Sequence, residues 1–165
     1  MPDAIAEINK CKYLFLSEIE ELDHNGLRLV VEEGRPCGEA KPLHVGESVI
    51  TGGTRIDVTE ESRAFELVWN RYVAYSVLNE SYASVDADER YVGTRFRVYS
   101  KSHFIEYVSR ASFATPEYPG PTQHYEVVCE NHIVDVISTA TPSVQVLKEP
   151  ARPANQPSGT VSRIT

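Results

Sequence analysis

Polar side chains that could catalyse a reaction or bind a ligand follow a long apolar stretch in the middle of this 165-residue sequence. Glu80 and Tyr82 come at its end, where polar groups that follow a buried strand are well placed to form a site. Glu80 could act there as a general base or bind a cationic group, with Tyr82 and His103 as further contacts. The structural alternative is that Glu80 forms an ion pair with Arg95 or Arg97 on the next strand.

A short acidic segment comes next and contains Asp86, Asp88 and Glu89. It lacks the repeated aspartates, the glycine and the final glutamate of a calcium-binding loop. We expect an exposed loop over residues 83–91, whose carboxylates form a contact surface for a basic protein partner. The alternative is a solvated loop without a partner.

His124, Cys129 and His132 carry the imidazole and thiol groups that bind zinc. On a strand, however, His124 and Cys129 would face opposite sides, because an odd number of positions separates them. Cys129 is more simply a buried apolar residue. Cys129, Glu130 and His132 also crowd one turn, where side chains diverge, whereas nucleophilic catalysis requires convergence. We therefore expect no metal site, no catalytic residue and no cofactor.

The element that must position Glu80 and Tyr82 is the stretch 64–82, AFELVWNRYVAYSVLNESY. Its first half alternates apolar and more polar residues, and its second half is almost continuously apolar. This pattern predicts a strand that begins half-buried and becomes buried on both faces, with Trp69 in the core. We expect one long strand with a bulge at residues 70–71, with a hairpin as the alternative.

The remaining pattern predicts an α+β fold, a predominantly antiparallel sheet of seven to nine short strands with one main helix packed on it. An apolar face at helical spacing places that helix over 101–111, capped by Ser100. Glycine and proline predict a loop over 34–48. Residues 17–26 allow either a short helix over 18–23 or a tight turn at residues 24–26. The other expected strands are 13–16, 27–33, 48–50, 54–58, 94–99, 124–129, 133–138 and 143–147.

The chain is expected to divide into a loose leader at 1–11, a single domain at 12–147 and a flexible proline-rich tail at 148–165. The formal net charge of −8 argues against nucleic acid or an anionic membrane surface as a partner, because both would repel the chain. No apolar run approaches the roughly 20 residues of a membrane helix. Three cysteines without a CxxC motif, and no signal-peptide pattern, favour the cytoplasm.

Three segments, YVAYSVLNESY (72–82), FRVYSKSHFIEYV (96–108) and HYEVVCENHIVDVIS (124–138), resemble a group of small bacterial proteins with no established activity. The resemblance covers about 12–147, implies a single bacterial domain with this order of strands and helix, and carries over no functional residue. By analogy of size and charge, we expect a non-enzymatic, immunity- or inhibitor-like protein-binding module. The alternatives are a small-molecule pocket or enzyme that uses Glu80 and Tyr82, and a homodimer formed through an exposed sheet edge.

Overall fold

Two five-stranded antiparallel sheets dominate the computed structural model, which describes residues 3–46 and 48–148. In the first sheet the order is β1-β2-β4-β10, and β3 pairs with the distal part of β2. In the second the order is β5-β9-β8-β7-β6. The strands of the first sheet are β1 (Tyr13–Leu22), β2 (Gly26–Val45), β3 (Ser48–Asp57), β4 (Ala64–Trp69) and β10 (Ser143–Lys148). Those of the second are β5 (Ala74–Asn79), β6 (Arg90–Val92), β7 (Phe96–Lys101), β8 (Gln123–Val128) and β9 (His132–Ser138).

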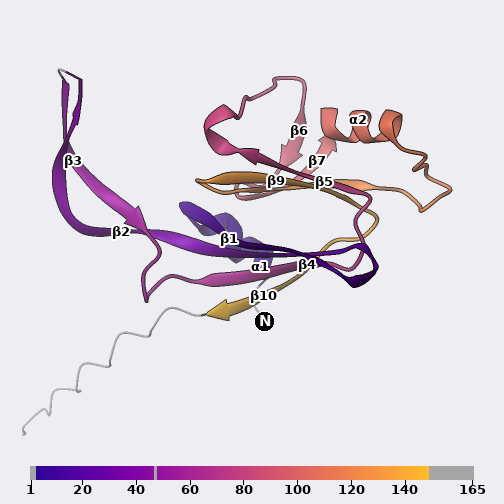
Figure 1. Cartoon of the computed structure of the whole chain (residues 1–165), viewed down its shortest axis with the longest axis horizontal. Helices are drawn as coiled ribbons and strands as arrows, with labels where there is room; N and C mark the ends of the chain where they lie inside the picture. Colours follow the sequence, from indigo (N-terminus) through magenta and orange to yellow (C-terminus); the bar gives the residue numbers. More distant parts are fainter. Residues whose placement is uncertain (1–2, 47, 149–165) are drawn as a thin grey trace, which may run out of the picture.

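The two sheets lie face to face, with helix α2 (His103–Ala111) on the outer side of the second sheet (Figure 1). One hydrophobic core fills the space between them, and both sheets contribute to it. Trp69 of the first sheet, only 1% exposed, contacts Tyr125 of the second at a ring-centroid distance of 6.1 Å. The predicted burial of Trp69 is therefore confirmed.

The predicted predominance of antiparallel sheet is confirmed, but the arrangement is richer than expected. The described residues form ten strands, against the seven to nine predicted, and two helices, against one main helix. The strands also divide between two packed sheets. Alternation along a strand reports which side chains are buried, and it carries no information about which sheet the strand joins.

The stretch 64–82 is neither one bulged strand nor a hairpin, so both expectations for it are wrong. Its first half is β4 in the first sheet and its second half is β5 in the second sheet. The chain crosses between the sheets at residues 70–73, where Tyr72 N donates to Asn25 O at 3.0 Å and Val73 N donates to Ile137 O at 2.7 Å. The prediction that the second half becomes buried on both faces is also wrong, because no residue of β5 is fully buried and Val77 and Leu78 are 44% and 41% exposed.

The prediction of a loop over 34–48 is also wrong, because β2 continues to Val45 and pairs with β3 as a two-stranded ribbon. Figure 1 shows this ribbon projecting from the body of the molecule. Its glycines have other roles than ending the strand. An added Cβ at Gly34 would lie 2.6 Å from the Phe15 ring, so only glycine fits there. Gly38, with φ of 77°, lies where the register with β3 shifts.

The expected loose leader is wrong for residues 4–10, which form helix α1 (Ala4–Lys10) with Ile8 fully buried in the core. Asp3 caps this helix by accepting from Ile5 N at 3.0 Å. Asn9 fastens it to the start of β7, because its Oδ1 accepts from the backbone amides of Thr94, Arg95 and Phe96 at 2.8–3.0 Å. A segment this short carries too little periodicity to reveal such contacts.

Two local alternatives are settled by the backbone. Residues 18–23 do not form the short α-helix: β1 runs to Leu22, and the chain reverses through His24 and Asn25, both with φ of 60°, so the tight turn is confirmed. The main helix is also confirmed, although Ser102 rather than Ser100 caps it, accepting from Ile105 N at 3.2 Å.

The expected tail beyond residue 148 lies outside the described residues. Within the described part of the chain, no helix has the length and apolar character needed to cross a membrane.

Candidate functional site

A pocket of about 240 Å³ lies on the outer face of the second sheet, beneath the segment that joins β5 to β6. We call it the acidic pocket. Its rim is that joining segment, with Glu80, Ala83, Ser84, Val85, Asp86 and Glu89. Its floor is formed by strands β6, β7, β8 and β9, with Tyr91, Arg97, Tyr99, Glu126, Val128 and Ile133. The site thus combines a carboxylate-rich rim with a floor that is partly apolar.

The floor is organised by the carboxylate of Glu126, which is almost fully buried. Arg97 and Glu126 are direct partners across β7 and β8, and Arg97 Nη1 donates to Glu126 Oε1 at 2.7 Å. The hydroxyl of Tyr99 donates to the other oxygen at 2.9 Å. Burial raises the pKa of Glu126, and the Tyr99 hydroxyl and the Arg97 guanidinium oppose that rise. Burial and the nearby Glu126 raise the pKa of the Tyr99 hydroxyl, so it stays a hydrogen-bond donor.

Arg97 also packs on an aromatic ring at the pocket floor. Its guanidinium carbon lies 4.4 Å from the centroid of Tyr91, within the range of a cation–π contact. The Nε atom of Arg97 is buried and has no hydrogen-bond partner in the described part of the chain. Arg97 is therefore held on two sides, by Glu126 and by Tyr91.

The rim is fastened to the start of α2. Asp86 Oδ1 accepts from Asp88 N at 2.8 Å, and Asp86 Oδ2 lies 3.1 Å from His103 Nε2. Glu89 Oε1 accepts from the backbone N of His103 at 3.0 Å. The hydrogen bond from Asp88 N is the main cause of a lowered pKa at Asp86. These contacts connect the acidic segment over the pocket to the start of α2.

The structure brings four of the six residues singled out from the sequence to this site. Glu80, Asp86 and Glu89 line the pocket, and His103 contacts Asp86 and Glu89 from α2. The side chain of Asp88 does not line the pocket, although its backbone amide supports Asp86. Tyr82, which is 79% exposed, does not line the pocket either.

The structural alternative for Glu80 is wrong. Arg95 instead pairs with Glu130 at 2.8 Å, and Arg97 pairs with Glu126 at 2.7 Å. Glu80 forms no ion pair with either arginine. Its carboxylate is therefore free of these two cations at the rim of the acidic pocket.

Sequence reasoning considered Arg97 only as a partner of Glu80, and it missed Tyr99 and Glu126, which lie with Arg97 at the floor. A signal was present, because β7 and β8 are consecutive strands of the sheet and carry an arginine and a glutamate on the same face. Pairing the two predicted strands in the register that places Arg97 opposite Glu126 would have found the ion pair. That register is set by tertiary contacts, and the local pattern does not specify it.

A chain of hydrogen bonds lies beside the pocket and resembles a Ser-His-Asp arrangement. Ser102 Oγ lies 2.7 Å from His124 Nδ1, and His124 Nε2 lies 3.0 Å from Asp135 Oδ1. Ser102 and His124 are only 3% and 2% exposed, and Ser102 Oγ also caps α2. A hydroxyl in that position cannot meet a substrate. The chain therefore fixes α2 on the sheet and provides no nucleophile.

Cys129 has the simple role expected of it. It is fully buried in the core between the sheets, and burial raises the pKa of its thiol to about 12. His124 lies on the opposite face, stacked on Tyr99 at 4.3 Å. Within the residues that the structure describes, His, Cys, Asp and Glu form no group that could hold a metal ion.

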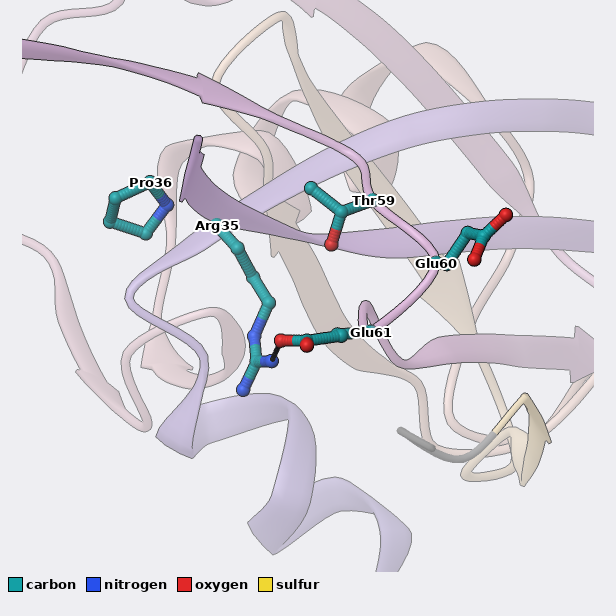
Figure 2. A pocket seen from close by; sticks show the side chains of 5 residues that line it. All are labelled: Arg35, Pro36, Thr59, Glu60 and Glu61. Carbon is teal, nitrogen blue, oxygen red and sulfur yellow. Dashed lines mark hydrogen bonds and ion pairs between the residues drawn. The ribbon is translucent and has the colours of Figure 1, made fainter. Parts of the chain in front are cut away.

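A larger depression of about 550 Å³ lies where the β2–β3 ribbon joins the body of the molecule, and Figure 2 shows its lining residues. Arg35 Nη1 lies 3.1 Å from Glu61 Oε2 there, so the one cation among the described lining residues already has a carboxylate partner. Glu60 points away from this pair (Figure 2). Because its charged groups do not converge on a common point, this depression is a weaker candidate than the acidic pocket.

Comparison with protein-family models, with curated protein sequences and with solved structures found no match for this chain. The resemblance of residues 12–147 to small bacterial proteins therefore stays an expectation. The interpretation of the acidic pocket rests on its geometry.

Proposed function

We propose that this chain is a protein-binding module whose acidic pocket receives a lysine or arginine side chain from a basic segment of a partner protein. The observation that carries the proposal is the placement of the rim carboxylates. Asp86 and Glu89 are held by His103 at the mouth of a pocket whose floor is already neutralised by the Arg97–Glu126 pair.

Charge favours a cationic occupant. Four carboxylates, those of Glu80, Asp86, Glu89 and Glu126, line the acidic pocket, and Arg97 is the one cation among its described lining residues. Since Arg97 pairs with Glu126, the described lining residues carry a net negative charge and contribute a negative field at the entrance. Such a field attracts a basic group and increases its rate of association.

Size favours a single side chain. A volume of about 240 Å³ is below the roughly 300–1,000 Å³ that is typical of small-molecule sites. A lysine or arginine side chain is long and narrow, with an apolar stem and a charged end. Val128 and Ile133 at the floor would contact the stem, and the rim carboxylates would surround the charge.

The surface around the pocket is suited to contact with a protein. Val85 is 93% exposed and Tyr82 is 79% exposed, so two large apolar side chains stand beside the acidic rim. Exposed aromatic residues next to a charged rim are typical of protein–protein interfaces. The contacts of Asp86 and Glu89 also preorganise the segment, which lowers the entropy lost on binding.

The alternative of a small-molecule site built from Glu80 and Tyr82 has less support. These two residues do not share the acidic pocket, because Tyr82 lies outside its lining. A small ligand held by Glu80 would also have to fill a pocket smaller than usual for that purpose.

Selection from a random peptide library tests the proposal, followed by calorimetric titration of an enriched peptide. We expect the enriched peptides to share a lysine or arginine. Replacement of that residue by methionine should abolish binding, and Glu80→Gln should weaken it about fivefold, since an exposed ion pair contributes about 1 kcal/mol.

Glu60→Gln is the matched control, because it makes the same change in net charge at an exposed position outside the acidic pocket. Its affinity for the enriched peptide should equal that of the unmodified protein. Enriched peptides without a basic residue, or equal effects of the two substitutions, would refute the proposal.

A further inference from the structure

A second cleft, of about 410 Å³, lies where three segments far apart in the sequence meet. Asn25 comes from the turn between β1 and β2, residues 71–73 form the crossing between the sheets, and residues 112–119 follow α2. Figure 1 shows these segments at one end of the sandwich, at the right of the view. The volume lies within the roughly 300–1,000 Å³ of small-molecule sites. We call it the crossover cleft.

Two exposed aromatic rings form one wall of the crossover cleft. Phe113 is 82% exposed and Tyr118 is 65% exposed. Their ring centroids are 6.1 Å apart and their planes differ by only 13°. The two rings stack on each other, and because both are exposed a further aromatic ring can extend this stack.

The segment that carries these rings is held by its own hydrogen bonds. Thr115 N donates to Tyr118 O at 2.7 Å, and Tyr118 N donates to Thr115 O at 3.1 Å. Ala114 N donates to Ser112 Oγ at 3.2 Å, and that hydroxyl in turn donates to Val108 O at the end of α2. The backbone that carries the two rings is therefore fastened to itself and to the end of α2.

The lining of the crossover cleft also includes one positive charge. Arg71 is the only charged side chain among the described residues that line the crossover cleft, and it has no ion-pair partner in the described part of the chain. Its backbone is fixed, because Ser138 Oγ donates to Arg71 O at 2.8 Å. The carboxylate of Glu21 accepts hydrogen bonds from the hydroxyls of Tyr72 and Tyr75, so its hydrogen-bond donors are these tyrosines and not Arg71.

We propose that the crossover cleft binds a small aromatic carboxylate. The ring of the ligand would stack on Phe113 and Tyr118, and its carboxylate would accept hydrogen bonds from the guanidinium of Arg71, which suits planar anions. The charge that this site prefers is opposite to that of the acidic pocket, and none of its lining residues is shared with it. Failure of one proposal in its test would therefore not refute the other.

A matched pair of probes tests this inference. Binding of 2-naphthoate and of the neutral 2-naphthamide is followed through backbone amide shifts in two-dimensional NMR spectra, up to about 5 mM, where ligands of millimolar affinity bind appreciably. We expect 2-naphthoate to bind more tightly than 2-naphthamide. The shifts should cluster at residues 71–73 and 112–119.

Variants then separate the charge of the cleft from its aromatic rings. Arg71→Gln should weaken 2-naphthoate about tenfold, because it removes a charge-assisted hydrogen bond, and should leave 2-naphthamide unchanged. Phe113→Ala should weaken both probes. Arg110→Gln changes the same charge on an exposed position of α2 outside the cleft and should affect neither.

Three results would overturn the inference. The first is the absence of saturable shifts with 2-naphthoate. The second is equal affinity of the unmodified protein for both probes, which would leave an apolar cleft without preference for an anion. The third is an equal loss of 2-naphthoate affinity in Arg71→Gln and Arg110→Gln, which would assign the effect to overall charge.

Discussion

Arg97 and Glu126 face each other across β7 and β8, with Arg97 Nη1 2.7 Å from Glu126 Oε1 at the floor of the acidic pocket. Neither side chain is freely exposed, since their side-chain exposures are 25% and 10%. The Tyr99 hydroxyl satisfies the second carboxylate oxygen. The pair therefore neutralises the floor and leaves the rim carboxylates to determine the charge of the entrance.

Replacement of Arg97 should destabilise the fold, because it leaves the Glu126 carboxylate buried without its cationic partner. We expect Arg97→Met to lower the free energy of unfolding by about 2 kcal/mol, less than the ~3–5 kcal/mol of a fully buried pair because Arg97 keeps some contact with water. The double variant Arg97→Met/Glu126→Met should regain most of that loss. Urea titrations of both variants measure the difference, and an equal loss in the two would contradict an ion-pair role.

The same variant should show a characteristic pH dependence. Burial raises the pKa of Glu126 above its ordinary value of 4.5, and Arg97 opposes this rise. Without Arg97, the pKa of Glu126 in the folded state should therefore rise further. The folded state then binds the proton more tightly than the unfolded chain does. The loss of stability of Arg97→Met relative to the unmodified protein should be absent below about the ordinary pKa of Glu126. It should grow as the pH rises through the folded-state pKa. Melting temperatures across this range check it, and a deficit that grows on acidification would exclude this explanation.

Acidification should loosen the rim of the acidic pocket. The pKa of Asp86 is lowered below its ordinary value of 3.8, chiefly by the hydrogen bond from Asp88 N. Asp86 therefore stabilises the fold above that ordinary value, and its contribution is lost as the pH falls through the lower folded-state pKa. The amide shift of Asp88 and the ring shifts of His103 should change together over this pH range, because these two groups contact the Asp86 carboxylate. In Asp86→Asn the coupled titration should disappear, and its persistence would assign it to another group.

Trp69 should be one of the most sensitive positions of the core. We expect Trp69→Ala to lower the free energy of unfolding by about 3–5 kcal/mol, because a large side chain leaves a cavity between the two sheets. Trp69→Phe should cost about 1.5 kcal/mol or less, since it keeps most of the volume and removes a buried Nε1 that has no partner in the described residues. Chemical denaturation measures both, and equal losses would argue against a cavity.

The N-terminal helix should contribute measurably to stability. Ile8 is fully buried, so Ile8→Ala should lower the free energy of unfolding by about 2–4 kcal/mol. Lys10→Ala, at an exposed position of the same helix, should change it by about 0.5 kcal/mol or less. If Ile8→Ala were as mild as Lys10→Ala in thermal melts, α1 would not be part of the cooperative fold.

The local pattern of the sequence determined features that depend on neighbouring residues. The apolar face of α2 follows from side chains at helical spacing, and the strands β8 and β9 follow from apolar residues around a turn at Glu130 and Asn131. The burial of Trp69 and of Cys129 could likewise be predicted. Such features are encoded within one or two turns of helix or one strand, where chain geometry alone decides which side chains share a face.

Tertiary structure decided what lies between distant segments. The stretch 64–82 is divided between two sheets, Asn9 binds the amides at the start of β7, and Asp86 meets His103 across the rim of the acidic pocket. Arg97 meets Glu126 only because β7 and β8 pair in one particular register. Partners of this kind are selected by the packing of the whole core, and local periodicity specifies only which side of a strand or helix each residue occupies.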